Sequence, residues 1–253
     1  MSDVPKIIFI VPYRNRETHL EYFKNHMKMV MEDYPADSYK YMFVHQQDTR
    51  EFNRGAIKNI GFIVASQLYP NDYKDITFVF NDVDSMPVHK NVLPYTTTVG
   101  TIKHFYGYTY TLGGIISVLG RDFERIGGFP NFWGWGYEDN LLQQRAIDAG
   151  IGINRDVFFK IGDKENIVQF EHGTERMMNK FDFDKYSKKT NEGLYTILKL
   201  EYNIDAETDF VNVTDFKTGY DEVKPAKFVY DLKNGNRPLQ FNKRKSTMQM
   251  HFL

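Results

Sequence analysis

Short apolar runs alternate with segments of helical periodicity over the first third of the chain. Residues 7–11, 41–44 and 76–80 are apolar without alternation, which is typical of strands buried on both faces of a parallel sheet, and we expect Pro12 to end the first of them. Between these runs, residues 17–34 and 56–69 place apolar side chains along one face of a helix. This order predicts an α/β fold with a right-handed, mostly parallel central sheet and flanking helices.

Polar clusters follow each predicted strand, at residues 14–16, 45–48 and 82–84. Ligands of such sheets bind beyond the carboxyl ends of the strands. Asp82 and Asp84 stand two positions apart, so one carboxylate can bind a divalent cation while the other holds a ribose hydroxyl or a metal-bound water. Magnesium and manganese prefer such oxygen ligands. The alternative is an ordinary polar turn, since Asp-x-Asp is a common sequence.

Three arginines near these strand ends, Arg14, Arg16 and Arg54, suit the phosphates of a nucleoside diphosphate. Surface salt bridges are the alternative interpretation. The first strand is followed neither by Gly-x-Gly-x-x-Gly nor by a Walker loop, so dinucleotide and P-loop sites lose their main support.

The middle of the chain is rich in glycine and aromatic residues. Gly113 and Gly114 precede an apolar run at 115–119, and residues 127–130 indicate a turn. Residues 141–149 are predicted to be helical, with Glu138 and Asp139 at the entrance of the helix. From about residue 217 the sequence becomes polar and strand-like, which we interpret as an extension packed on the main domain.

Composition narrows the range of partners and compartments. The 253 residues suit one large α/β domain or two small ones, and the formal net charge of -1 gives no field that would attract nucleic acid or an anionic membrane. The chain has no cysteine, which excludes disulfides, zinc–thiolate sites and cysteine nucleophiles. Because the first residues show no signal peptide or anchor, we expect a soluble, cytoplasmic protein.

Five motifs occur together in one order: residues 12–16, 52–55, 78–84, 113–114 and 127–139. In these motifs the chain resembles the β-1,4-galactosyltransferase family, and the similarity extends over about residues 5–216. The resemblance implies a GT-A fold with one catalytic domain at 1–216 and a C-terminal extension at 217–253. It also implies inverting transfer of a hexose from a UDP-sugar to a hydroxyl of a glycan or glycoconjugate acceptor, with Mn²⁺ or Mg²⁺.

The resemblance also assigns roles to single residues. Asp84 and His172 would bind the metal, Asp139 would be the general base, and Glu138 would face the acceptor with it. The glycines around Trp133 and Trp135 are expected to let a loop hinge and close over the donor. The donor would contact Pro12, Arg14, Arg16, Phe52, Arg54, Asp82, Val83, Gly113, Gly114 and Trp135.

The chain departs from the family pattern at three places. Gln169 and Phe170 stand where members have a methionine or a second histidine, so the amide oxygen of Gln169 is the candidate third metal ligand. Asn140 replaces a frequent aspartate. Thr111 replaces a bulky tyrosine, which leaves room for an N-acetylated donor such as UDP-GalNAc. The family's Golgi anchor and cysteines are missing, which suggests a prokaryotic, viral or otherwise cytosolic enzyme.

Two other functions stay open from the sequence. A nucleotidyltransferase would share the sheet and the acidic metal site but would not need Trp135 or Asp139. A non-catalytic protein that binds carbohydrate or nucleotide sugar on the same fold is the other alternative; Asp84 and Asp139 argue against it, while Gln169 and Phe170 keep it open.

Overall fold

A nine-stranded mixed sheet forms the centre of the molecule, in the order β11-β12-β2-β1-β3-β6-β5-β7 with β8 paired to β5. The computed structural model describes residues 4–170, 173–235 and 239. The strands of this sheet are β1 (Ile7–Tyr13), β2 (Tyr39–Gln46), β3 (Thr77–Asn81), β5 (Thr101–Gly107), β6 (Ile115–Leu119), β7 (Gly152–Asn154), β8 (Phe159–Lys160), β11 (Lys199–Asp205) and β12 (Phe210–Lys217).

The three predicted strands are confirmed as parallel neighbours, with β1 between β2 and β3. The expectation that Pro12 ends the first strand is wrong, because β1 continues through Pro12 to Tyr13. Beyond Ile10, β1 pairs with β2 alone, so Pro12 lies where the strand has a neighbour on one side only. A proline without an N–H donor is tolerated at such an edge position.

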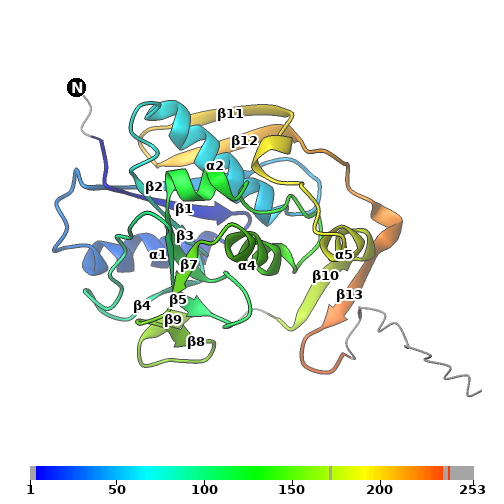
Figure 1. The fold of residues 1–253 in the computed structure, drawn as a ribbon. Helices are drawn as coiled ribbons and strands as arrows, with labels where there is room; N and C mark the ends of the chain where they lie inside the picture. The colour runs from blue at the N-terminus through cyan, green and yellow to red at the C-terminus, as the bar shows by residue number, and fades with distance from the viewer. Residues whose placement is uncertain (1–3, 171–172, 236–238, 240–253) are drawn as a thin grey trace, which may run out of the picture.

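Five helices accompany the sheet: α1 (Glu17–Val30), α2 (Arg54–Leu68), α3 (Gly120–Arg125), α4 (Glu138–Asp148) and α5 (Lys180–Ser187). Figure 1 shows α1 and α2 on opposite faces of the sheet. Alternate residues of β1 enter two separate cores, with Phe9 packed on the α1 side and Ile10 on the α2 side. The sheet is therefore buried on both faces, as its unbroken apolar strands predict.

Helix α2 begins two residues earlier than its periodicity predicts. The side chain of Asn53 accepts a hydrogen bond from the backbone N–H of Ala56 at 2.9 Å, which caps the helix. Asn53 is itself fixed, because its backbone N–H donates to Gln46 Oε1 at the end of β2. This cap places Arg54 on the first turn of α2, at the carboxyl edge of the sheet.

Two small antiparallel sheets lie beside the main one. One joins β4 (Ser85–Pro87) to β9 (Ile167–Gln169), and the other joins β10 (Glu175–Asn179) to β13 (Lys227–Asp231). Short 3₁₀ helices occur at Leu194–Thr196 and Lys224–Ala226. The predicted domain boundary after residue 216 falls within β12 and stays a prediction.

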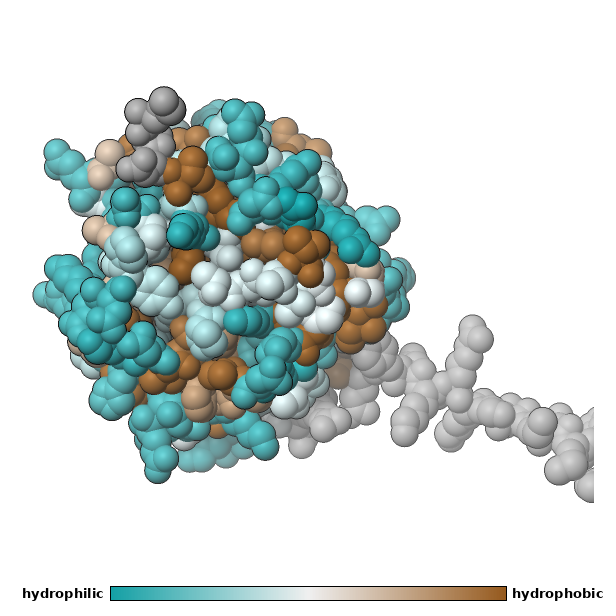
Figure 2. Space-filling view, turned by 60° about the vertical axis from the view of Figure 1, so that its left-hand side comes forward, coloured by the Kyte–Doolittle hydropathy of each residue, from teal (hydrophilic) through white to brown (hydrophobic). Residues whose placement is uncertain are grey.

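On the face drawn in Figure 2, hydrophobic residues form several separate groups between hydrophilic ones. Among the helices in the described ranges, none combines the length and the apolar character that crossing a bilayer requires.

Candidate active site

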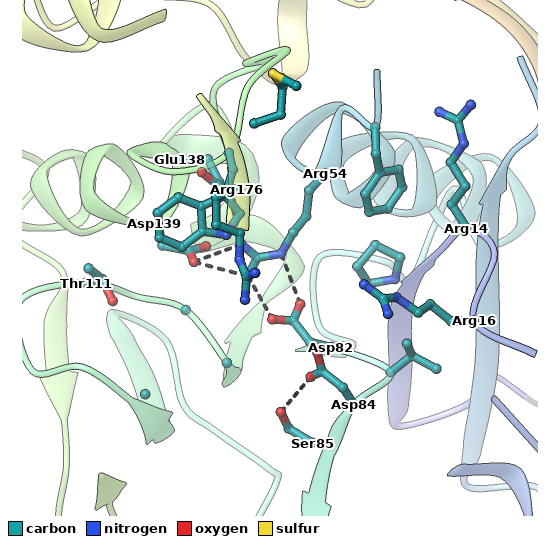
Figure 3. A pocket seen from close by; sticks show the side chains of 18 of the residues that line it. Arg14, Arg16, Arg54, Asp82, Asp84, Ser85, Thr111, Glu138, Asp139 and Arg176 are labelled. Carbon is teal, nitrogen blue, oxygen red and sulfur yellow. Dashed lines mark hydrogen bonds and ion pairs between the residues drawn. The ribbon is translucent and has the colours of Figure 1, made fainter. Parts of the chain in front are cut away.

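A pocket of about 560 Å³ opens at the carboxyl edge of β1 and β3 (Figure 3). Its position agrees with the rule that α/β sheets bind ligands beyond the carboxyl ends of their strands. All but one of the predicted site residues line this pocket; His172 lies outside the described residues. Those in the pocket are Pro12, Arg14, Arg16, Phe52, Arg54, Asp82, Val83, Asp84, Gly113, Gly114, Trp135, Glu138, Asp139 and Gln169.

Arg54 joins three carboxylates that come from different parts of the chain. Its Nη2 donates to Asp82 Oδ2 at 2.8 Å, and its Nη1 donates to Glu138 Oε1 at 2.5 Å. Both terminal nitrogens lie 3.1 Å from Asp139 Oδ2. Figure 3 shows these side chains pointing toward one another. The residue predicted to bind the donor phosphates thus links the carboxylate that follows β3 to the two at the start of α4.

Burial and charge act against each other in this cluster. Burial by itself would raise the pKa of Asp82, but the charges of Arg54 and Lys58 outweigh it and hold that pKa below its usual range. Burial dominates at Glu138 and raises its pKa, with Arg54 opposing and Asp139 adding to the shift. Burial would lower the pKa of Arg54, yet the surrounding carboxylates raise it. Asp82 is therefore the firmly ionised partner of Arg54, while Glu138 holds a proton more readily than usual.

Asp139 lies on the first turn of α4 and packs directly against the backbone of Gly113. A Cβ added to Gly113 would come within 2.3 Å of Asp139 Oδ2, so no other residue fits there without displacing the carboxylate. The backbone N–H of Leu112 donates to the Asp139 carbonyl at 3.0 Å, which fixes the same approach. The N-terminus of α4 also favours negative charge at this position. Glu138 and Asp139 thus stand at a helix entrance, as predicted.

Asp84 and Gln169 both line the pocket and belong to adjoining segments. Ser85 follows Asp84 and pairs with Gln169 in the small sheet of β4 and β9, and Ser85 Oγ donates to Asp84 Oδ1 at 2.8 Å. Tyr106 donates its hydroxyl hydrogen to Gln169 Oε1. Carboxylate and amide oxygens are ligands that suit Mn²⁺ or Mg²⁺.

The chain that leads to His172 is anchored to the backbone of Asp84. Phe170 donates its N–H to the Asp84 carbonyl at 2.9 Å, two residues before His172. Within the described ranges, no three or more His, Cys, Asp and Glu side chains form a group that could hold a metal. The predicted ligand set is completed only by His172 and therefore stays a prediction.

Arg14 is held by backbone carbonyls of the loop after β2. Its Nη1 donates to Arg50 O at 2.5 Å and its Nη2 donates to Asp48 O at 2.7 Å. The side chain therefore stabilises this loop by hydrogen bonds and also lines the pocket. No role of Arg14 toward a phosphate is needed to explain its position.

The two tryptophans have different environments, although both were expected on a moving loop. Trp133 belongs to the core: it is 1% exposed, stacks on Phe216, and donates Nε1–H to the Tyr220 carbonyl at 3.1 Å. Both tryptophans line the pocket, but Trp135 is 43% exposed. The loop function predicted for Trp133 is thus wrong, because its ring fills a space between the sheet and the C-terminal segment.

The segment after Trp133 is tied to later parts of the chain. Gly134 N–H donates to Asp182 Oδ2 at 2.6 Å, and Tyr220 donates its hydroxyl hydrogen to Asp182 Oδ1 at 2.7 Å. The N–H of Trp135 donates to the Met177 carbonyl of β10 at 2.7 Å. Arg176 of β10 lies over the Trp135 ring, with its guanidinium carbon 5.7 Å from the ring centre.

Sequence reasoning missed several residues at the site, notably Lys58, Tyr106 and Arg176. Lys58 had a usable signal: it is a lysine within an otherwise apolar helical segment, four positions after Arg54 and therefore on the same helix face. Arg176 and Tyr106 had none, because their positions depend on how β10 and β5 fold back to the pocket.

Two family models match consecutive parts of the chain. Residues 3–96 match the N-terminal region of glycosyl transferase group 7, and residues 94–173 match the N-terminal domain of galactosyltransferase. The curated relatives include xylosylprotein 4-β-galactosyltransferase of Caenorhabditis elegans, 31% identical over 82% of this chain and 68% of its own length. Human β-1,4-galactosyltransferase 5 is 28% identical over 83% of this chain, which spans only 55% of that relative.

Solved structures agree with the fold. The catalytic domain of Drosophila β1,4-galactosyltransferase 7 in complex with xylobiose has a TM-score of 0.64 at 22% identity, covering 88% of this chain and 98% of its own. A mutant of that enzyme in complex with manganese, UDP-Gal and xylobiose gives a TM-score of 0.60 at 21% identity, with the same coverage. The fold is therefore GT-A, and the matched models and relatives show that the chain belongs to the β-1,4-galactosyltransferase family of glycosyltransferases.

Proposed function

We propose that this chain transfers a hexose, with inversion, from a UDP-sugar to a hydroxyl of a glycan or glycoconjugate acceptor. The observation that carries the proposal is the convergence of Asp82, Glu138 and Asp139 on Arg54 within one pocket. The first carboxylate follows a sheet strand and the other two begin α4. We call the residues around Asp82 the donor side and those around Glu138 and Asp139 the acceptor side; the two sides meet at Arg54.

Asp139 is the proposed general base. It would accept the proton of the attacking hydroxyl as the bond from the anomeric carbon to the diphosphate breaks and the new glycosidic bond forms on the opposite face. Its buried Oδ1 accepts no hydrogen bond from any described residue, so the carboxylate keeps hydrogen-bonding capacity that the described side chains do not use. Glu138, whose pKa burial raises, is suited to donate a hydrogen bond to the acceptor.

Asp84, Gln169 and His172 are the proposed metal ligands. A divalent cation bound there would offset the charge that develops on the departing diphosphate. Support comes from the oxygen chemistry of Asp84 and Gln169 and from the manganese in a Drosophila relative's structure. Arg16 and Arg176, which also line the pocket, would add positive charge beside the same phosphates.

The donor sugar is proposed to be galactose or N-acetylgalactosamine. Relatives are named for galactose transfer, and one is solved with UDP-Gal. Thr111 lines the pocket just before Gly113, and its backbone N–H donates to the Tyr108 carbonyl at 3.2 Å, so the side chain stands on a closed turn. A threonine there leaves more room beside the second carbon of the sugar than a tyrosine does.

The decisive experiment measures UDP release from UDP-Gal and from UDP-GalNAc, with and without Mn²⁺. Xylobiose is a rational first acceptor, because a structural relative binds it. Manganese-dependent UDP release that increases with acceptor supports transfer. Binding of either donor without turnover would instead support the non-catalytic carbohydrate-binding alternative.

Thr111→Tyr tests the donor assignment. The larger ring should fill the space for an acetamido group, so the ratio of kcat/KM for UDP-GalNAc to that for UDP-Gal should fall by about 10-fold or more, which corresponds to about 1.4 kcal/mol. Competition between the two donors measures this ratio directly. A wild-type enzyme that strictly prefers UDP-Gal would contradict the role given to Thr111.

A further inference from the structure

Lys58 is a fully buried cation directly beneath the carboxylate cluster. Its side chain is 1% exposed, and its Nζ lies 3.4 Å from Asp82 Oδ1 and 3.8 Å from Asp139 Oδ1. The ammonium also lies 4.6 Å from the centre of the Phe129 ring. It therefore contacts one carboxylate on the donor side and one on the acceptor side.

The neighbours of Lys58 on α2 show that this position belongs to the core. Ile57 and Ile60 are fully buried, and both contribute to the core between α2 and the sheet. Burying a lysine ammonium among such residues costs several kcal/mol unless carboxylates pair with it. The ion pairs with Asp82 and Asp139 are the compensation that the structure provides.

Lys58 and Arg54 differ in their access to ligands. They stand four residues apart on one face of α2, but Arg54 lines the pocket and Lys58 does not. A diphosphate entering the pocket can compete with the carboxylates for Arg54, whereas Lys58 lies behind them. Lys58 is thus the one cation in this described cluster whose pairing a bound donor leaves in place.

Asp139 depends on such a fixed partner. Its Oδ2 is held by Arg54 alone among the described side chains, while its buried Oδ1 accepts no hydrogen bond and lies 3.8 Å from Lys58 Nζ. If Arg54 turned toward a donor phosphate, Lys58 would be the remaining counter-charge of this carboxylate.

We propose that Lys58 is a positioning residue that holds Asp139, together with Asp82, in its reactive place once the donor has engaged Arg54. The proposal rests on the function proposed above for Asp139. Lys58 itself touches neither substrate, and its effect passes through the two carboxylates.

The first test does not depend on turnover. Lys58→Met keeps an unbranched side chain that is one atom shorter and removes the charge. Crystal structures of the wild type and of this variant, each soaked with UDP and Mn²⁺, should show the Asp139 carboxylate turned away from Gly113 in the variant alone. An Asp139 carboxylate in the same place in both structures would overturn the proposal. This comparison stands even if the wild type releases no UDP, an outcome that would instead remove the proposed function.

The second test is a double-mutant cycle with Asp139→Asn. In the wild-type background, Lys58→Met should lower kcat about 10- to 100-fold with the acceptor KM changed less than about 2-fold, because a misplacement of about 1 Å can cost that much. In the Asp139→Asn background it should lower kcat by no more than about 2-fold. Equal losses in both backgrounds would mean that Lys58 acts independently of Asp139, against the proposal.

Ile57→Val is the matched control on the same helix. It removes one buried methylene next to Lys58 and should cost about 0.5–1.5 kcal/mol of stability without a change in kcat. A loss of kcat in this control comparable to that of Lys58→Met would show that general loosening of α2, and not the missing charge, explains both variants.

Discussion

The two sides of the pocket are built in different ways. The donor side consists of residues at the ends of adjacent parallel strands, such as Pro12 in β1 and Asp82 after β3, which the sheet itself holds together. The acceptor side is a loop and a helix entrance, held by contacts such as that of Gly134 with Asp182, 48 residues later in the chain. The sheet holds the residues of the donor side in place, and single long-range hydrogen bonds hold those of the acceptor side.

The comparison predicts that the two sides fail differently when mutated. Asp84→Ala on the donor side should abolish the increase in donor affinity that Mn²⁺ provides and lower kcat/KM by about 1,000-fold, since a bound metal supplies several kcal/mol of charge stabilisation. Calorimetric titration of UDP with and without Mn²⁺ measures the first effect. Unchanged manganese dependence would remove Asp84 from the metal site.

Asp139→Asn on the acceptor side should have the opposite signature. Donor affinity should stay within about 2-fold of wild type, while kcat should fall at least about 100-fold, the typical contribution of a general base. The same UDP titration and a transfer assay separate the two quantities. If turnover survived, another group would have to take the proton.

Gly113→Ala tests whether the acceptor-side carboxylate needs its close approach to the backbone. The added Cβ would meet Asp139 Oδ2 at 2.3 Å, so the carboxylate must move, and we expect kcat to fall about 10- to 100-fold. Gly152→Ala is the control, because its Cβ would only reach ordinary contact with the Gly100 carbonyl at 3.5 Å. Similar activity of both variants would contradict the proposed packing of Asp139.

Asp182→Asn gives a smaller effect, on stability. Burial raises the pKa of Asp182 from 3.8 to about 6, so its protonation favours the folded state. The stabilisation is fully present below about pH 4 and is lost as pH rises through about 6, which amounts to about 3 kcal/mol for a shift of about 2 units. The unfolding free energy of the wild type minus that of Asp182→Asn should therefore fall by this amount from pH 4 to pH 8. A constant difference would show that Asp182 titrates in its usual range.

The same contrast explains what the sequence could predict. The apolar runs around Ile8, Met42 and Phe78 located the three parallel strands, and strand ends carry Asp82 and Asp84 to one edge. Periodicity could not reveal that β6 pairs antiparallel with β3, or that β12 pairs with β2, because the regular alternation of strand and helix ends after β3.

Individual side chains at the site were predictable only where a motif carried them. Asp139 was found through its motif, whereas Lys58 was hidden because a single lysine does not disturb a helical pattern. Trp133 was misassigned because it shares Gly134 with Trp135 in one motif, and the packing on Phe216 separates the two. The role of His172 stays a prediction, because that residue is outside the described ranges.

The pairing of β13 with β10 has a consequence for biosynthesis. Arg176 and Met177 of the pocket wall lie on β10, whose partner strand ends at Asp231, whereas all four acidic residues of the pocket centre precede residue 140. During synthesis the carboxylates therefore precede by many residues the strand that pairs with this wall. A chain halted before residue 227 would carry every residue that lines the pocket but lack the strand that pairs with β10.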